Sequence, residues 1–289
     1  MFQIDIEVSF NSSRKTHATL VSELSPAFKA QSGDTVDFQI DFNKRSLVVY
    51  ADLLILVASI VSYLNQKGVK VTGTIHCEPN DDKILYASRV NFFQLIGLPF
   101  EEKFQRKPSI GRLTELTPYN AETFTPVADN LRKVVIANIA VDIQVQALLD
   151  YCLSEIMDNV LRHSDYPNID CGKGMVCAQL FQSNKEIRLM ICDAGVGIHE
   201  ALTKSERSKY KDLTEEEALN KCIERGVTNG EGLGFGLFAT SEFIRLNKGE
   251  MVLYSGNTFI RIINGKITTQ KGNFWQGTFV FMRIKTNIP

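Results

Sequence analysis

The order of the hydrophobic patterns in the second half of this chain constrains its fold more than any other feature. A helical period runs through residues 127–161, with a break expected near Val141 or Asp142. Strand-like runs follow at 174–182 and 186–192, and the chain ends in MVLYS, TFIRII, KITTQ and GTFVFMRI. Helices followed by a sheet with glycine-containing loops predict an α+β layer with a ligand site at those loops.

The first third instead alternates strand-like and helical patterns. Residues 2–8, 36–42 and 46–50 have strand character, 52–66 has the length of a helix, 69–76 reads as a buried strand, and 82–96 reads as a helix. This succession predicts a small α/β domain with a βαβ unit. The stretch 101–126 is rich in charge, Pro, Thr and Gly and has no helical period. We therefore expect an α/β domain at 1–110, a linker at 111–126 and a second domain at 127–289.

Length and composition agree with two globular domains and exclude several classes of protein. The chain has 289 residues, of which 22% are charged, and its net charge of -1 gives no field that would attract nucleic acid. Its longest apolar run, at 53–61, is shorter than the roughly 20 residues of a membrane helix, and its start lacks the pattern of a secretory signal. The six cysteines form no CxxC pair, which favours reduced thiols over disulfides or zinc. We expect a cytoplasmic protein.

The helix LLDYCLSEIMDNVLRHSD carries the first candidate site residues. At about 100° per residue, Glu155, Asn159 and Arg162 lie opposite the apolar side of the helix. A solvated helix face explains this pattern without any function. The functional reading is that Asn159 supplies an oxygen to Mg²⁺ while Glu155 orients or deprotonates a nucleophile.

Two glycine-containing segments carry the remaining candidates. In IRLMICDAGVGI, a strand leads into Asp193, Gly195 and Gly197, where a turn can lie against a planar ligand and a carboxylate can accept from an amine. In NGEGLGFGLFATSEFI, glycines at 230, 232, 234 and 236 precede a helix, whose free amides can bind phosphates. The second segment lacks the Lys-Ser/Thr of a P-loop and does not directly follow an apolar strand, which disfavours both common nucleotide-binding motifs.

Together these motifs resemble those of the GHKL superfamily of ATP-binding domains. ExxxNxxxH at 155–163, DxGxG at 193–197, GLGFGL at 232–237 and GTFVF at 277–281 occur in the order of that superfamily, with similar separations. The superfamily includes gyrase, heat-shock chaperone ATPases, histidine kinases, MutL proteins and the anti-sigma-factor serine kinases, which the motifs resemble most. The resemblance implies a Bergerat-type two-layer sandwich in which helices cover a mixed, mostly antiparallel sheet.

The resemblance also implies a role for each motif residue. Asp193 would bind the adenine amino group with support from Thr278, Asn159 would ligate Mg²⁺, and Glu155 would be the catalytic base. The remaining ATP-binding residues would be Gly195 and Gly197 at the adenine, Gly232, Leu233, Gly234, Phe235, Gly236 and Leu237 along the phosphates, and Arg162 and His163. For Arg162 and His163 a capping or surface role is the alternative. Residues 200–229 would form a mobile ATP lid.

Residues 46–100 resemble, more loosely, the STAS-like domains of bacterial partner-switching regulators. Those domains carry a phosphorylatable Ser or Thr at the start of a helix, where this chain has Tyr50, Ala51, Asp52, Leu53 and Leu54. We therefore expect no phosphorylation at this position and interpret Asp52 as a helix cap.

Three functions follow from these expectations. The first is a nucleotide-gated regulatory ATPase that binds ATP and Mg²⁺ and acts on a regulatory protein partner, with a homodimer as a further expected assembly. The second is a protein serine/threonine kinase of the anti-sigma type, and the third is a non-catalytic nucleotide-binding module. A sensor histidine kinase is disfavoured, because none of His17, His76, His163 and His199 lies in the helical motif of a phosphoacceptor. Neither a membrane nor a nucleic acid is an expected partner.

Overall fold

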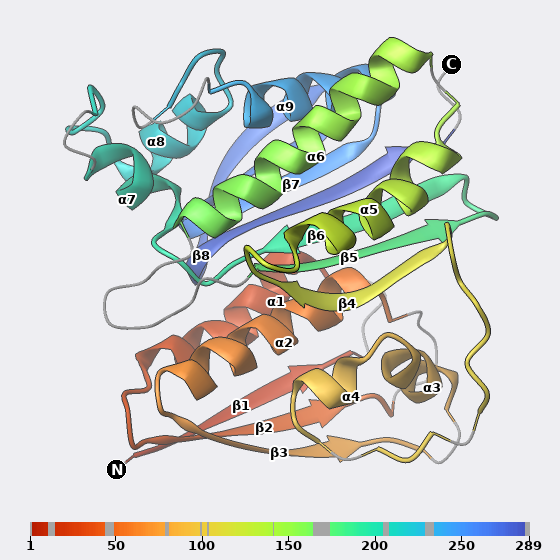
Figure 1. Cartoon of the computed structure of the whole chain (residues 1–289). Coiled ribbons are helices and arrows are strands. Elements are labelled where there is room, and N and C mark those ends of the chain that lie inside the picture. Colours follow the sequence, from red (N-terminus) through yellow and green to blue (C-terminus); the bar gives the residue numbers. More distant parts are fainter. Residues whose placement is uncertain are drawn as a thin grey trace. The chain divides into compact units, whose positions relative to one another are not determined.

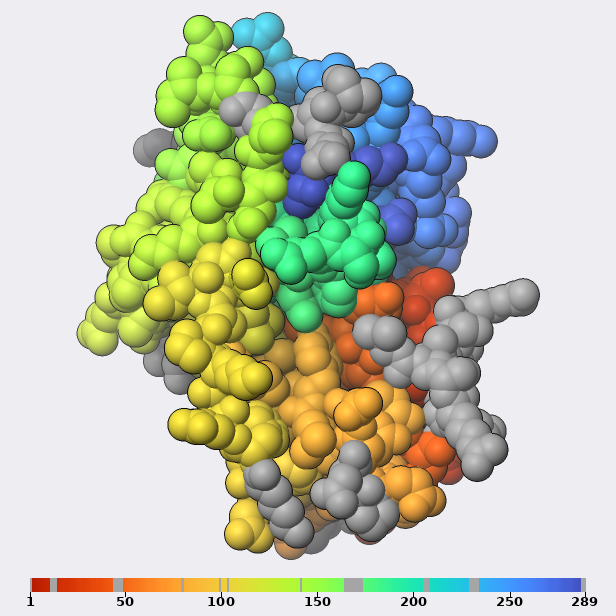
Figure 2. Space-filling model, turned by 90° about the vertical axis from the view of Figure 1, so that its right-hand side faces the viewer, coloured from red at the N-terminus to blue at the C-terminus, as the bar shows by residue number. Residues whose placement is uncertain are grey.

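The computed structural model describes residues 2–10, 15–43, 49–78, 81–98, 100–102, 104–140, 142–163, 174–204, 208–228 and 234–286. The chain forms two compact units, Met1–Pro108 and Ser109–Pro289. In Figure 2, the colours from red to orange-yellow belong to the first unit and those from yellow to blue belong to the second. None of the described helices is both long and apolar enough to cross a membrane.

The first unit is built on a three-stranded parallel sheet. In chain order its elements are β1 (Gln3–Ser9), α1 (His17–Leu24), η1 (Ser25–Lys29), β2 (Thr35–Asp41), α2 (Ala51–Gln66), β3 (Lys70–His76), α3 (Asp82–Arg89) and α4 (Phe92–Leu95). The strands lie in the order β1-β2-β3, with α1 and α2 as the crossovers (Figure 1). The expected α/β pattern is thus confirmed for this unit.

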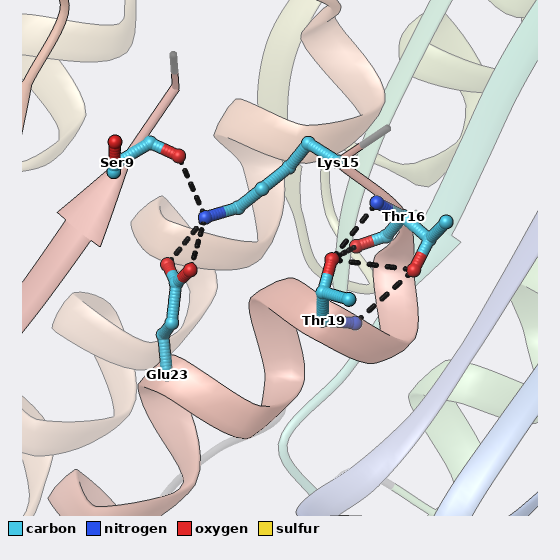
Figure 3. Close-up of polar contacts among 5 residues, drawn as sticks. All are labelled: Ser9, Lys15, Thr16, Thr19 and Glu23. Carbon is cyan, nitrogen blue, oxygen red and sulfur yellow. Dashed lines mark hydrogen bonds and ion pairs between the residues drawn. The ribbon is translucent and has the colours of Figure 1, made fainter. Parts of the chain in front are cut away.

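Helix α1, which the patterning did not predict, begins at a capping box. The Thr16 side chain accepts from the backbone N–H of Thr19, and the Thr19 side chain accepts from that of Thr16 (Figure 3). Next to this cap, Lys15 Nζ donates to the backbone oxygen of Ser9 at 2.7 Å and pairs with Glu23, which joins the end of β1 to α1 (Figure 3). Burial lowers the pKa of Lys15 despite this partner.

Four expectations for the first unit differ from the structure. The segment 69–76 is half-exposed rather than buried, because β3 is an edge strand. The expected helix at 82–96 splits at Asn91, whose φ of 68° is incompatible with a continuous helix. Asp52 does not cap α2: the N-cap residue is Tyr50, and the buried Asp52 Oδ2 instead lies 2.9 Å from Nε2 of His17. Of the expected strand at 46–50, residues 46–48 lie outside the described residues and 49–50 form no strand.

The second unit is a five-stranded antiparallel sheet with helices packed on one face. Its elements are β4 (Leu113–Tyr119), α5 (Phe124–Val135), η2 (Ile136–Asn138), α6 (Ile143–His163), β5 (Gly174–Phe181), β6 (Glu186–Cys192), α7 (Gly197–Thr203), α8 (Glu215–Cys222), α9 (Gly236–Asn247), β7 (Glu250–Ile263) and β8 (Lys266–Lys285). The strand order is β4-β5-β6-β8-β7, and α5, α6 and α9 cover the same face (Figure 1). Their apolar residues form one core with that face of the sheet. The expected break between two helices near residue 141 and the expected strands β5 and β6 are confirmed.

The second unit also corrects three predictions. The linker expected at 111–126 contains β4. Polar residues share this strand with the buried Leu116 and Tyr119, so the sequence shows no apolar run there. The sheet is antiparallel at every described pair rather than mixed, because β4 and β5 are separated by two helices and not by the single crossover helix of a parallel pair. The four strands expected at the end of the chain merge into the long hairpin β7–β8, which turns at Asn264 and Gly265.

Candidate functional site

One pocket of the second unit collects most of the predicted site residues. Its cavity volume is about 130 Å³. The predicted residues that line it are Glu155, Asn159, Arg162, His163, Asp193, Gly197, Gly234, Gly236, Leu237 and Thr278. Residues far apart in the sequence thus meet at one place: the second half of α6, the end of β6, the start of α9 and strand β8.

Asp193 is the most buried polar group of the pocket. It follows β6 directly and is 4% exposed. Its Oδ1 accepts from the backbone N–H of Gly195 at 2.8 Å and from that of Thr278 at 3.2 Å. Burial raises the pKa of Asp193 to about 7, and the two backbone donors oppose that rise. The pocket therefore holds a carboxyl group whose charge changes near neutral pH.

The turn after Asp193 needs glycine for two reasons. Gly197 and Gly277 both have positive φ values, 79° and 84°. A Cβ on Gly277 would lie 2.5 Å from Oδ1 of Asp193, and one on Gly197 would lie 2.8 Å from Oγ of Ser255. Side chains at either position would therefore strain the backbone and push apart the segments that shape the pocket.

Two residues that sequence reasoning missed hold this turn in place. Gln276, which is 7% exposed, donates from Nε2 to the backbone oxygen of Gly195. Ser255, on β7, binds the N–H of Ile198 and the backbone oxygen of Gly277, each at 2.9 Å. Gly195 itself belongs to the turn but does not line the pocket. No local pattern marks Ser255 or Gln276, because their partners Gly195, Ile198 and Gly277 are distant in the sequence.

Helix α6 contributes the polar side of the pocket. Glu155 and Asn159 are half-buried one turn apart, and they line the pocket together with Ile156 and Val160 of the same helix. Burial raises the pKa of Tyr151. Its contacts with Glu155, which include a hydrogen bond, add to this rise.

The end of α6 makes one contact within the helix and one with the turn after β6. Arg162 lines the pocket and forms an ion pair with Asp158 one turn earlier. The backbone oxygen of His163 accepts from the N–H of Val196 at 3.0 Å, which connects α6 to the turn after β6. The ion pair with Asp158 agrees with the surface role that we left open for Arg162.

The start of α9 approaches α6 closely. A Cβ on Gly236 would lie 2.6 Å from Cβ of Glu155, so only glycine permits this separation. Phe235 is described but does not line the pocket, and its ring lies 5.5 Å from the guanidinium of Arg225. Gly232 and Leu233, which we also predicted to bind the phosphates, lie outside the described residues.

The segment expected to form a lid contains two helices. Among its described residues, Ala218 and Leu219 of α8 are buried in the core. The Glu215 carboxylate at the start of α8 accepts from the backbone N–H of Asn257 on β7 at 3.2 Å. Helix α8 is therefore packed on the β7–β8 hairpin, and the mobility of the segment stays a prediction.

The walls of the pocket are apolar, and its few polar groups accept or donate hydrogen bonds at defined places. The walls are lined by Ile156, Val160, Ile191, Ile198, Ala201, Leu202, Val227 and Val280.

Cys222 also lines the pocket, and burial raises the pKa of its thiol far above the usual range. Of the cysteines in the described ranges, Cys152, Cys177, Cys192 and Cys222 are buried free thiols and Cys77 is a half-buried one; Cys171 lies outside those ranges. Within the same ranges, no three His, Cys, Asp or Glu side chains gather to hold a metal ion.

Comparisons with known proteins add no assignment. No protein-family model matches the chain, and no curated protein matches it.

Proposed function

We propose that the second unit is a GHKL-type ATP-binding domain and that the protein is a nucleotide-gated regulatory ATPase. The observation that carries the proposal is the meeting of Glu155, Asn159, Asp193, Gly236 and Thr278 at one pocket. These residues come from motifs separated by up to about 120 positions in the sequence, and local patterning does not bring them together. The antiparallel sheet with helices on one face supports the same proposal.

The chemistry of the pocket fits an adenine nucleotide. The apolar walls accommodate a flat heterocycle, and Asp193 lies among them as an acceptor for an exocyclic amine. The start of α9, which a glycine keeps close to α6, offers free backbone N–H groups to phosphates at the positive end of the helix dipole. A base end and a phosphate end thus lie at the same pocket.

The helix α6 would supply the metal ligand and the base. Asn159 offers an amide oxygen to Mg²⁺, which in proteins is commonly held by few side chains together with phosphate oxygens and water. Glu155, one turn earlier, would take a proton from water as it attacks the terminal phosphate.

The regulatory part of the proposal concerns the α7–α8 segment and the first unit. Bound nucleotide would contact α7 and change the position of α7 and α8. Whether the STAS-like unit binds a regulatory protein would then depend on the position of these two helices.

A thermal-shift titration tests nucleotide binding. ATP, ADP and a non-hydrolysable ATP analogue are titrated with and without Mg²⁺, and phosphate release is measured for ATP. We expect each nucleotide to raise the melting temperature by mass action. The Asp193→Ala variant should show no shift, because the loss of its acceptor leaves the base unpaired at that edge.

The outcomes separate the proposal from its alternatives. Absence of a shift with the parent protein would refute nucleotide binding. A shift without phosphate release, even after candidate partners from cell extract are added, would identify a non-catalytic module. Transfer of labelled phosphate to a protein of the extract would identify a kinase.

A further inference from the structure

The hydroxyl of Ser255 joins three segments at the base end of the pocket. Ser255 lies on β7, is 7% exposed and pairs in register with Thr278 on β8. Its Oγ contacts the N–H of Ile198 at 2.9 Å, the backbone oxygen of Gly277 at 2.9 Å and, more weakly, Oγ1 of Thr278 at 3.4 Å. These partners belong to α7 and β8, so one side chain connects the walls of the pocket.

The number of protons and lone pairs determines the direction of each of these bonds. A serine hydroxyl has one proton and two acceptor lone pairs. The Gly277 carbonyl can only accept, so it takes the Ser255 proton, and the Ile198 N–H can only donate, so it takes one lone pair. The remaining lone pair of Ser255 accepts, and Thr278 must therefore donate its proton to Ser255.

This direction leaves Thr278 as an acceptor toward the pocket. With its proton directed to Ser255, the Thr278 Oγ1 has only lone pairs for a ligand. The neighbouring Asp193 has the same polarity when ionised, because a carboxylate only accepts. When Asp193 is ionised, both polar side chains at this end of the pocket require a ligand group that donates.

We propose that Ser255 is a positioning residue that makes the pocket selective for 6-amino over 6-oxo purine nucleotides, by holding the Thr278 hydroxyl as an acceptor. The inference rests on the proposed function, since it concerns the base of the bound nucleotide. A 6-amino group donates two hydrogen bonds, whereas a 6-oxo group only accepts and would face the Thr278 lone pairs and an ionised Asp193 with no proton between them. A site built for one polarity rejects the other because its buried groups are left unpaired.

The close packing around Ser255 shows why a small residue is needed there. The Cβ position of Gly197 lies 2.8 Å from Ser255 Oγ, so a larger side chain on β7 would displace the start of α7. The informative variant is therefore Ser255→Ala, which removes the hydroxyl and adds no volume. It frees the Thr278 hydroxyl to rotate and to donate to a 6-oxo group.

The test compares ATP with inosine triphosphate, whose base has a 6-oxo group in place of the amine. Dissociation constants of both are measured by calorimetry for the parent, Ser255→Ala and Ser241→Ala. Ser241 is the matched control, because it is a buried serine of the same unit whose hydroxyl donates to the Phe238 backbone oxygen within α9. We expect Ser255→Ala to reduce the preference for ATP by about tenfold, the effect of one hydrogen bond, while Ser241→Ala leaves the preference unchanged.

A second variant tests the route through Thr278. In a Thr278→Val background, the preference should already be reduced, and adding Ser255→Ala should reduce it no further. If Ser255→Ala does not fold, the preference of Thr278→Val for ATP over inosine triphosphate tests the inference instead. An additional loss of preference in the double variant would overturn the inference.

The remaining outcomes distinguish this inference from the proposed function. Unchanged preference in a folded Ser255→Ala variant overturns the inference and leaves the proposed function intact. A parent protein that binds neither nucleotide overturns both. Hydrogen exchange of the ligand-free proteins gives an independent readout: the amide of Ile198 should exchange faster in Ser255→Ala than in the parent, and equal rates would contradict the bond on which the inference depends.

Discussion

Replacing Asp193 with asparagine should make the stability of the second unit less dependent on pH. The Asp193 carboxyl is buried, and burial raises its pKa from 3.8 to about 7. In the unfolded chain the same group is ionised from about pH 4 upward. Between these values the folded state binds the extra proton, so the parent protein loses stability as the pH rises toward and through about 7.

The size of this loss follows from the difference between the two pKa values. At 1.36 kcal/mol for each pH unit, a change from 3.8 to about 7 corresponds to about 4 kcal/mol. The asparagine side chain of the variant would remain neutral and would still accept from the Gly195 and Thr278 N–H groups. The unfolding free energy of Asp193→Asn, relative to that of the parent, should therefore increase by about 4 kcal/mol between pH 4 and pH 8.

Urea unfolding of the ligand-free proteins across this pH range measures the effect. Trp275 is the single tryptophan of the chain, is 1% exposed and packs edge-on against Phe279, so its fluorescence reports on the second unit. Asp212→Asn, at an exposed position of the same unit, is the control and should show no such trend. A difference between Asp193→Asn and the parent that stays constant from pH 4 to pH 8 would refute the reasoning.

Three further predictions concern the pocket residues on α6 and α9. Asn159→Ala should weaken binding of ATP with Mg²⁺ more than binding of metal-free ATP, because its proposed partner is the cation; equal weakening in calorimetry would argue against a metal ligand. Glu155→Gln should preserve the dissociation constant for ATP and lower phosphate release by about 10²- to 10⁴-fold, and full turnover would exclude a base at this position. Gly236→Ala should destabilise the second unit by about 1–3 kcal/mol and reduce turnover, because the new methyl group would lie 2.6 Å from Cβ of Glu155. An unchanged midpoint of urea unfolding would show that α9 moves away from α6 at no cost.

The helices of the second unit and two of its strands could be predicted from the sequence, because their patterns are local. The apolar period of α6 and the short apolar runs of β5 and β6 depend only on residues close in the chain. The candidate site residues on α6 and after β6 were also recognisable, since Glu155 and Asn159 share a helix face and Asp193 ends a strand.

Features that depend on pairing between distant segments were not predictable. Strand β4 is polar at alternate positions and became recognisable only through its pairing with β5. The strands expected separately at the end of the chain join into one hairpin because β7 and β8 pair along their length. Asp52 has the residue type and position of a cap, and only the packing of α1 on α2 provides His17 as its partner.

The sequence by itself determined which residues of the second unit we predict as site residues, and the tertiary structure decided how they are held. The DxGxG and GTFVF motifs are the basis for predicting Asp193, Gly197 and Thr278. The contacts of Ser255 with Ile198 and Gly277, by contrast, depend on the register between β7 and β8 and on the place where α7 begins. Register is a property of two segments together, and a shift of one residue would turn Ser255 to the other face of the sheet.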